Sequence, residues 1–264
     1  MAAMKPGQIL LAVLAVGTCM TGARSGLAQV SPSAAGARKA VVTVPFVGCA
    51  SDGQVGPVKA PTGKSKVVAI PAAVAQRLAY YRAEHSDGVL APRGWHCFST
   101  YGSSGANLFV SPDPIDAKML FSRDWKGFAG QVIQISFSSG GTSGRFEVAK
   151  IVARVFPAYK ALAENVIAEG LEPASDFPFS PCPKDKLTYR SKSVVEYETP
   201  ANTEGLGTDS RLQMNASPID GVAILTGEDT DLIQLSARLS NRDRDLIPII
   251  IRQVESEEAS PAGH

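Results

Sequence analysis

The sequence predicts an α+β fold, in which a mixed or mostly antiparallel sheet packs with two or three helices and the chain contains a disulfide. Strand-like and helix-like segments follow one another irregularly, without the steady strand–helix rhythm of a doubly wound sheet. Several segments alternate apolar and polar residues, which is typical of half-buried strands. Apolar residues make up 44% of the chain, which is enough for a substantial core.

The first half of the expected domain contains short strands around one predicted helix. β-Branched residues predict strands at 41–48 and 66–71, with a loop rich in glycine and proline between them. Residues 72–84 are predicted to be a helix because their apolar residues recur at helical spacing. That stripe consists of Val74, Leu78 and Tyr81. A loop at 91–105 then leads into a strand at 106–112.

In the next part of the chain, a strand precedes the clearest helical pattern. Residues 131–137 alternate, which places Ile133, Ile135 and Phe137 on one face and Gln134 and Ser136 on the other. Residues 145–156 are predicted to be a helix whose apolar face consists of Phe146, Ala149, Val152 and Phe156. Pro157 ends that helix, and a second helical piece follows at 158–168.

The remaining segments predict strands and a final helix. A long alternating strand is expected at 187–199, with Leu187, Tyr189, Val195 and Tyr197 on one face. Residues 221–226 and 232–239 are two strand patterns joined by a five-residue polar connection, which predicts a hairpin. The second of these buries Ile233, Leu235, Ala237 and Leu239. A short helix at 243–256 closes the domain.

The N-terminal residues indicate export. One lysine precedes an apolar run of twelve residues, Ile9 to Met20, and small residues Gly26 and Ala28 then occupy the positions of a cleavage site. We therefore expect a signal peptide at 1–28, cleaved after Ala28. An uncleaved anchor is an alternative, although the run is short for a bilayer span. A lipoprotein site at Cys19 is another, although Thr18 fits poorly before it.

The predicted organisation of the remaining chain is simple. A disordered lead-in at 29–40 precedes a single α+β domain at 41–256, and a disordered tail follows at 257–264. The proline-rich segment 170–186 is a possible internal boundary. No second long apolar run occurs, so the mature chain is expected to lack a membrane span and to be periplasmic or secreted. The net charge of +1 is unlike a nucleic-acid-binding surface, and no nucleic-acid partner is expected.

Export gives the cysteines a structural role. Cys49, Cys97 and Cys182 remain after cleavage, and an oxidising compartment favours bridging two of them. Cys49–Cys97 is the preferred pair and Cys97–Cys182 the alternative. Cys182 lies between prolines and suits an unpaired or intermolecular thiol. A catalytic Cys97 is disfavoured, because the side chain of neighbouring His96 points to the opposite face in an extended backbone.

Two glycine-rich loops are candidate ligand-binding regions. In the loop 91–105, Trp95, Phe98 and Tyr101 could stack on a ligand such as a glycan, although such rings more often cover a small core. Trp95, His96 and Tyr101 are the candidate ligand contacts of this loop. In the loop 138–145, backbone amides together with Ser143 and Arg145 could contact an anion, although tight connectors use glycine for the same turns. The loop 138–145 matches neither a P-loop nor a nucleophile elbow.

Metal and cofactor chemistry has little support in the sequence. The histidines and cysteines lack the spacing of known metal sites, so no metal is expected. The acidic group Glu228, Asp229 and Asp231 lacks the pattern of a calcium loop and falls in a predicted hairpin turn, where acids are simply solvated. No cofactor is expected either.

Four stretches carry a resemblance that spans much of the mature chain. They resemble exported bacterial proteins of no assigned function: "PFVGCASDGQVGP", "VLAPRGWHCFSTYGSSG", "SSGGTSGRFEVA" and "YETPANTEGLGT". The resemblance implies an extracytoplasmic location and transfers no catalytic residue. We expect a binding or accessory protein of the bacterial envelope that recognises a protein or a cell-wall component. The alternative is an extracytoplasmic hydrolase with a site near 91–105 and 138–145.

Overall fold

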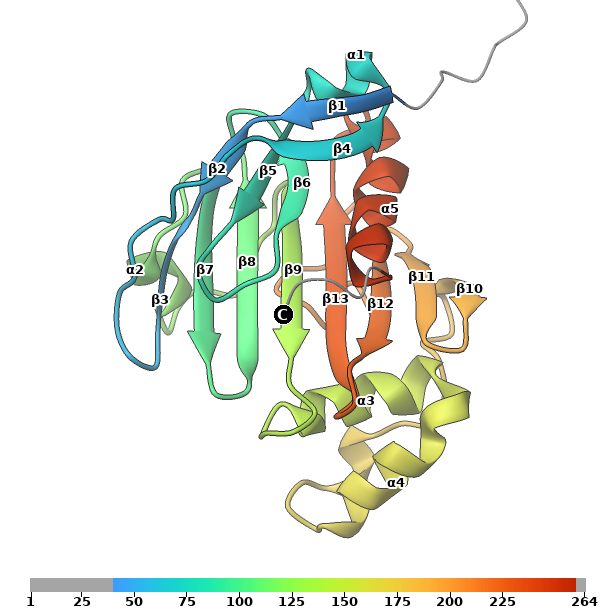
Figure 1. Ribbon diagram of the computed structural model, residues 1–264. Coiled ribbons are helices and arrows are strands. Elements are labelled where there is room, and N and C mark those ends of the chain that lie inside the picture. The colour runs from blue at the N-terminus through green and yellow to red at the C-terminus, as the bar shows by residue number, and fades with distance from the viewer. Residues whose placement is uncertain (1–39, 260–264) are drawn as a thin grey trace, which may run out of the picture. The chain divides into compact units, whose positions relative to one another are not determined.

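A computed structural model describes residues 40–259, and its largest element is an antiparallel sheet (Figure 1). In that part of the chain eight strands pair in the order β10-β11-β12-β13-β9-β8-β7-β3. Only β3, at one edge, pairs in parallel, with β7. The strands are β3 (Ala50–Gly53), β7 (His96–Gly102), β8 (Gly105–Ser111), β9 (Val132–Ser138), β10 (Lys186–Ser191), β11 (Val194–Thr199), β12 (Ile219–Thr226) and β13 (Asp231–Arg238).

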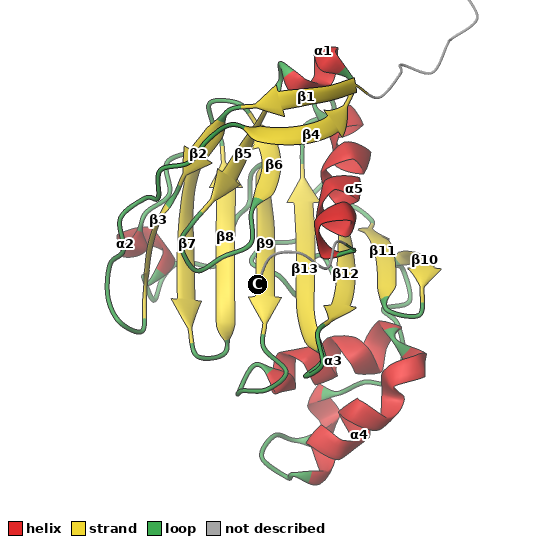
Figure 2. Ribbon diagram, in the orientation of Figure 1, coloured by secondary structure: helices red, strands yellow, loops and turns green. Residues whose placement is uncertain are grey.

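Smaller sheets and helices complete the α+β fold, so the predicted fold class is confirmed (Figure 2). A three-stranded sheet contains β2 (Phe46–Gly48), β5 (Leu78–Arg82) and β6 (Val89–Pro92). Strands β1 (Ala40–Val44) and β4 (Lys66–Ile70) form a separate pair. The helices of the described residues are α1 (Ala72–Ala75), α2 (Ala117–Leu120), α3 (Arg145–Val155), α4 (Lys160–Ala168) and α5 (Ile247–Glu258).

The large sheet is covered on both faces. Because successive side chains of a strand point to opposite faces, the pattern of each strand assigns its residues to one of two cores. On one face, Ile133, Ile135 and Leu235 pack with α5, β5 and β6. On the other, Ala223 and Leu225 pack with α3 and α4, and a smaller cluster around Phe109, Ile115 and Leu120 lies beside them. No helix within residues 40–259 is long and apolar enough to cross a membrane.

Several predicted elements are confirmed. Helices α3, α4 and α5 form where helical spacing predicts them, and α5 extends two residues beyond the expected end at 256. Strands β12 and β13 form the predicted hairpin, in which Thr226 pairs with Asp231. The described residues belong to one compact unit, and Phe177, from the possible boundary at 170–186, is buried against α3 and α4. The predicted signal peptide at 1–28 lies outside the described residues.

The predicted helix at 72–84 is wrong. Helix α1 ends at Ala75, and the chain continues as β5, whose residues Leu78 to Tyr81 are all buried. A fully buried strand has no polar face, so its apolar residues fall at helical spacing by coincidence. Tyr81 fixes this strand, because its hydroxyl donates to the carbonyl oxygen of Pro92 at 2.8 Å.

The predicted strand at 187–199 is a hairpin instead. Strands β10 and β11 are joined at residues 192–193, with a register shift after Tyr189. In this hairpin Leu187 faces Tyr197 and Tyr189 faces Val195, so the four residues still share a face. Four consecutive polar residues at 190–193 interrupt the alternation, but the turn contains neither glycine nor proline, so the usual turn signals are missing.

Polar residues of the central strands are buried as well, unlike the solvated face that alternation suggests. Gln134 is 4% exposed, because the chain around Arg211 lies over it. Its side-chain oxygen accepts from the Arg211 backbone N–H at 2.9 Å, and its side-chain nitrogen donates to Asn107 at 3.1 Å. Arg238 is 2% exposed and donates to the carbonyl oxygens of Phe128, Ala129, Gly130 and Gln213.

Candidate functional site

The two glycine-rich segments chosen from the sequence meet at one end of the large sheet. Strands β8 and β9 are neighbours, and Gly105 pairs with Ser138 at their shared end (Figure 1). Just beyond it, the Ser139 N–H donates to the Ser104 carbonyl oxygen at 2.9 Å. The turn between β7 and β8 therefore lies beside the connection from β9 to α3.

Gly144 allows this close approach. A Cβ atom at Gly144 would lie 2.2 Å from the carbonyl oxygen of Ser104 and 2.6 Å from that of Ser139, and both oxygens belong to backbone. Such distances are far below van der Waals contact, so a side chain here would force the two segments apart. The glycine identified as a turn residue thus serves as a packing residue between the two loops.

A depression of about 230 Å³ lies between these segments, and we call it the loop hollow. Its lining comes from the β5–β6 loop, the β7–β8 turn and the β9–α3 connection. The lining residues are His85, Tyr101, Gly102, Ser103, Gly105, Ala106, Phe137, Ser139 and Thr142. None of them is Asp, Glu, Lys or Arg, so the hollow offers aromatic faces and hydroxyl groups rather than charges.

Two rings form one wall of the loop hollow. The rings of His85 and Tyr101 have centroids 4.5 Å apart and planes inclined at 43°. The Tyr101 hydroxyl donates to the Gly56 carbonyl oxygen at 2.6 Å, which fixes the orientation of its ring. His85 is exposed and Tyr101 half-buried, so both rings remain partly accessible to a bound molecule.

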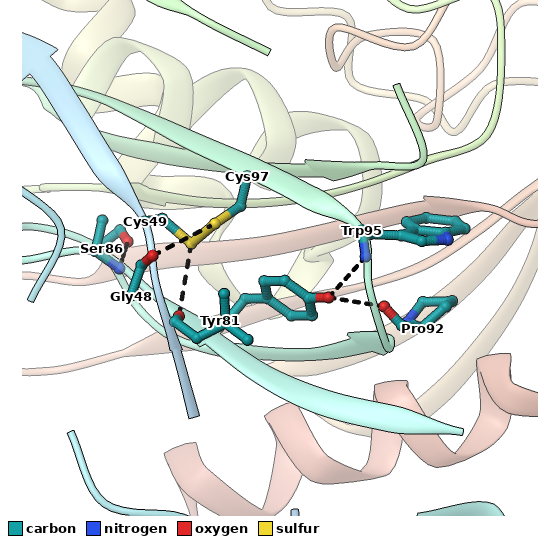
Figure 3. The surroundings of a disulfide bond; sticks show 9 residues. Gly48, Cys49, Tyr81, Ser86, Pro92, Trp95 and Cys97 are labelled. Carbon is teal, nitrogen blue, oxygen red and sulfur yellow. Dashed lines mark hydrogen bonds between the residues drawn. A yellow bond between two sulfur atoms is a disulfide. The ribbon is translucent and has the colours of Figure 1, made fainter. Parts of the chain in front are cut away.

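Of the three aromatic residues proposed from the 91–105 loop, the structure places only Tyr101 in the hollow. The predicted loop is mostly strand, since β7 begins at His96 and β8 at Gly105. Trp95 and His96 lie at the opposite end of β7, about 16 Å away at strand spacing. The Trp95 N–H donates to the Tyr81 hydroxyl at 3.1 Å, and its ring packs partly buried on the core (Figure 3). His96 is exposed there.

The residues proposed for anion contact are also outside the lining. Ser143 is exposed in the turn before α3, and Arg145 is paired with Glu169 through a contact of 2.6 Å between Nη2 and Oε2. This hydrogen-bonded pair raises the pKa of Arg145 and lowers that of Glu169. Thr142, one residue before Ser143, is the member of this turn that reaches the hollow.

Most amides of the β9–α3 connection have acceptors within the chain. The Gly140 N–H donates to Asp231 at 2.8 Å, and the Gly144 N–H donates to the Thr142 hydroxyl at 3.3 Å. Asp231 was expected to be merely solvated, but its carboxylate takes the place that an external anion would need. The geometry therefore gives no support to the anion contact considered from the sequence.

The predicted Cys49–Cys97 disulfide is confirmed (Figure 3). It joins the start of β3 to the start of β7, with Cα atoms 5.4 Å apart, and Cys49 is 1% exposed. The alternative Cys97–Cys182 pairing is wrong, and a bonded Cys97 cannot act as a nucleophile. The Cys182 sulfur accepts from the Arg154 guanidinium at 2.8 Å, while burial raises the pKa of its thiol.

The structure offers no histidine–nucleophile pair for the hydrolase alternative. No hydrogen bond in residues 40–259 joins His85 or His96 to Cys97 or to a serine of the hollow; the described contact of His85 is with the Tyr101 ring. The same residues contain no group of three or more His, Cys, Asp and Glu positioned to hold a metal ion.

Sequence reasoning missed the contribution of His85 and Phe137 to the hollow. His85 follows a segment that the sequence predicts to be helical. Because part of that segment forms strand β5 instead, the loop after it places His85 beside Tyr101. Phe137 lies on the face that packs toward the core, where alternation alone gives no reason to expect access to a hollow. The glycine content of the two loops indicated the region of the hollow, but it did not indicate these two side chains.

Comparison with known proteins offers no precedent for this arrangement. No family model matches the chain, and no similar curated protein or solved structure is found.

Proposed function

We propose that this chain is an exported protein of the bacterial envelope, periplasmic or secreted, that binds an envelope component in the loop hollow. Three features support the proposal. The N-terminal pattern is that of a cleaved signal peptide. The Cys49–Cys97 disulfide is of a kind that persists in oxidising compartments. The third is the hollow itself.

The binding role is inferred from the His85–Tyr101 ring pair, which lies at the edge of a concave site. Ligand sites are concave and combine aromatic surface with a few placed polar groups. Here the ring pair stands beside the hydroxyl-bearing residues Ser103, Ser139 and Thr142. The disulfide fixes β7 at one end, so the strand that carries Tyr101 is held in place.

The compartment is tested by expressing the full chain with a C-terminal tag in a bacterium and separating the cell fractions. We expect the protein in the periplasm or medium, with Gln29 as its first residue. A protein that stays in the cytoplasm with its first residues intact would contradict the export part of the proposal.

Binding is tested by sedimenting the exported protein with purified cell-wall material. We expect His85→Ala to reduce the sedimented fraction, because it removes half of the ring pair. His96→Ala is the matched control, since His96 is an exposed histidine at the far end of β7. Equal binding by both variants would refute the role of the hollow. Release of soluble fragments from the cell wall would instead favour the hydrolase alternative.

A further inference from the structure

The chemistry of the loop hollow indicates a more specific ligand. The absence of Asp, Glu, Lys and Arg from its lining leaves His85 as its one titratable side chain besides Tyr101, and this disfavours charged ligands, because a buried charge needs a partner. Its volume of about 230 Å³ is also below the 300–1,000 Å³ that is usual for drug-sized ligands. The hollow therefore accommodates one small, uncharged unit, with any remaining part of a larger molecule outside.

The walls of the hollow match a unit that has apolar faces and polar edges. Tyr101 presents its ring rather than its hydroxyl, because the hydroxyl is bound to the Gly56 carbonyl oxygen. Phe137 and Ala106 add apolar surface, while Ser103, Ser139 and Thr142 add hydroxyl groups. A pyranose ring has this character, since its C–H groups form apolar faces and its hydroxyls lie around the edge.

Backbone geometry makes an extended peptide a poorer match. A bound strand requires a row of unpaired backbone donors and acceptors at a sheet edge. The Ser139 N–H is bound to Ser104, and the Ser139 carbonyl oxygen accepts from the Thr142 N–H and hydroxyl. Strand β8 pairs with β7 and β9 on its two sides, so no sheet edge opens onto the hollow there.

We infer that the loop hollow binds a single neutral sugar ring of an envelope glycan, with the pyranose face against the His85–Tyr101 pair. This inference depends on the proposed function, because it names the component that the envelope-binding site recognises. The hydroxyls of Ser103 and Ser139 bind the edge of the same ring, because the Thr142 hydroxyl already donates to the Ser139 carbonyl oxygen and accepts from the Gly144 N–H.

The test uses the exported, oxidised protein and three soluble probes: the neutral trimer of N-acetylglucosamine, polygalacturonic acid and a cell-wall stem peptide. Binding is measured by calorimetry and by NMR shifts of the His85 and Tyr101 rings. We expect the trimer to bind and to compete with cell-wall material, and the other two to do neither. His85→Ala should weaken trimer binding by about tenfold, the upper range for an aromatic contact. His96→Ala should leave it unchanged.

The outcomes separate this inference from the proposed function. Cell-wall sedimentation that depends on His85 but is unaffected by the trimer would overturn the sugar assignment and leave the envelope role intact. Binding of the stem peptide at the two rings would likewise overturn it. Trimer binding without cell-wall sedimentation would support the sugar site and contradict the envelope role. Ser103→Ala, at an exposed turn residue, provides a second variant, which we expect to weaken trimer binding without changing the folded state.

Discussion

Loss of the Cys49–Cys97 disulfide should remove a large share of the stability of the fold. The two cysteines are 48 residues apart, and closing a loop of that length in the unfolded chain corresponds to about 4 kcal/mol. Single domains are usually stable by about 5–15 kcal/mol, so this contribution is substantial. With a urea dependence of about 3 kcal/mol/M, the Cys49→Ala/Cys97→Ala variant should unfold at a midpoint about 1.3 M lower.

The assay is urea unfolding followed by circular dichroism, with and without reductant. The native chain under reductant should approach the midpoint of the double variant, which should itself be insensitive to reductant. Cys182→Ala is the control: it removes a cysteine outside the bridge and should preserve the effect of reductant. A double variant as stable as the native chain would refute the argument from loop closure.

Three further predictions concern other parts of the molecule. Burial and neighbouring Glu196 raise the pKa of Glu255, so the folded chain loses stability as pH rises beyond the ordinary glutamate pKa of about 4.3. Glu255→Gln should therefore stabilise the protein at pH 7 but not at pH 4 in thermal unfolding; an equal effect at both would contradict this cause. Arg238→Met should cost about 3 kcal/mol in urea unfolding by leaving buried carbonyl oxygens without donors, and a neutral result would show that water replaces them. Gly144→Ala should destabilise by about 1–3 kcal/mol through backbone clashes, whereas Gly102→Ala, with open space around it, should be close to neutral; similar midpoints would refute the packing role of Gly144.

Local patterns predicted the elements that have one distinctly apolar face. The apolar stripe of α3 and the alternation of β9 and β13 each agree with the structure, because one face of each packs on a core. The β5 strand was missed because both of its faces are buried. Its continuous apolar run lacks the two-residue alternation of a half-buried strand and is therefore easily assigned to a helix. The turn between β10 and β11 was missed because its polar residues, 191–193, include neither glycine nor proline.

The candidate site was predictable only as a region. Glycine content identified the two loops, and strand pairing between β8 and β9 brings them together. The identity of the side chains in the hollow depends on long-range placement: His85 comes from the β5–β6 loop, and Trp95 lies beside Tyr81, at the end of β7 opposite Tyr101. Such choices depend on packing between distant segments, which a single sequence does not specify.

The parallel pairing of β3 with β7 has a consequence for the order of folding. Hairpins such as β12–β13 close after a few residues, whereas β3 meets β7 only when the intervening chain has been placed. Loop-closure entropy delays such distant contacts, so this edge of the sheet is expected to be assembled late. The bridge between Cys49 and Cys97 is therefore a chemical marker of maturation, because a molecule that carries it has already placed β3 beside β7.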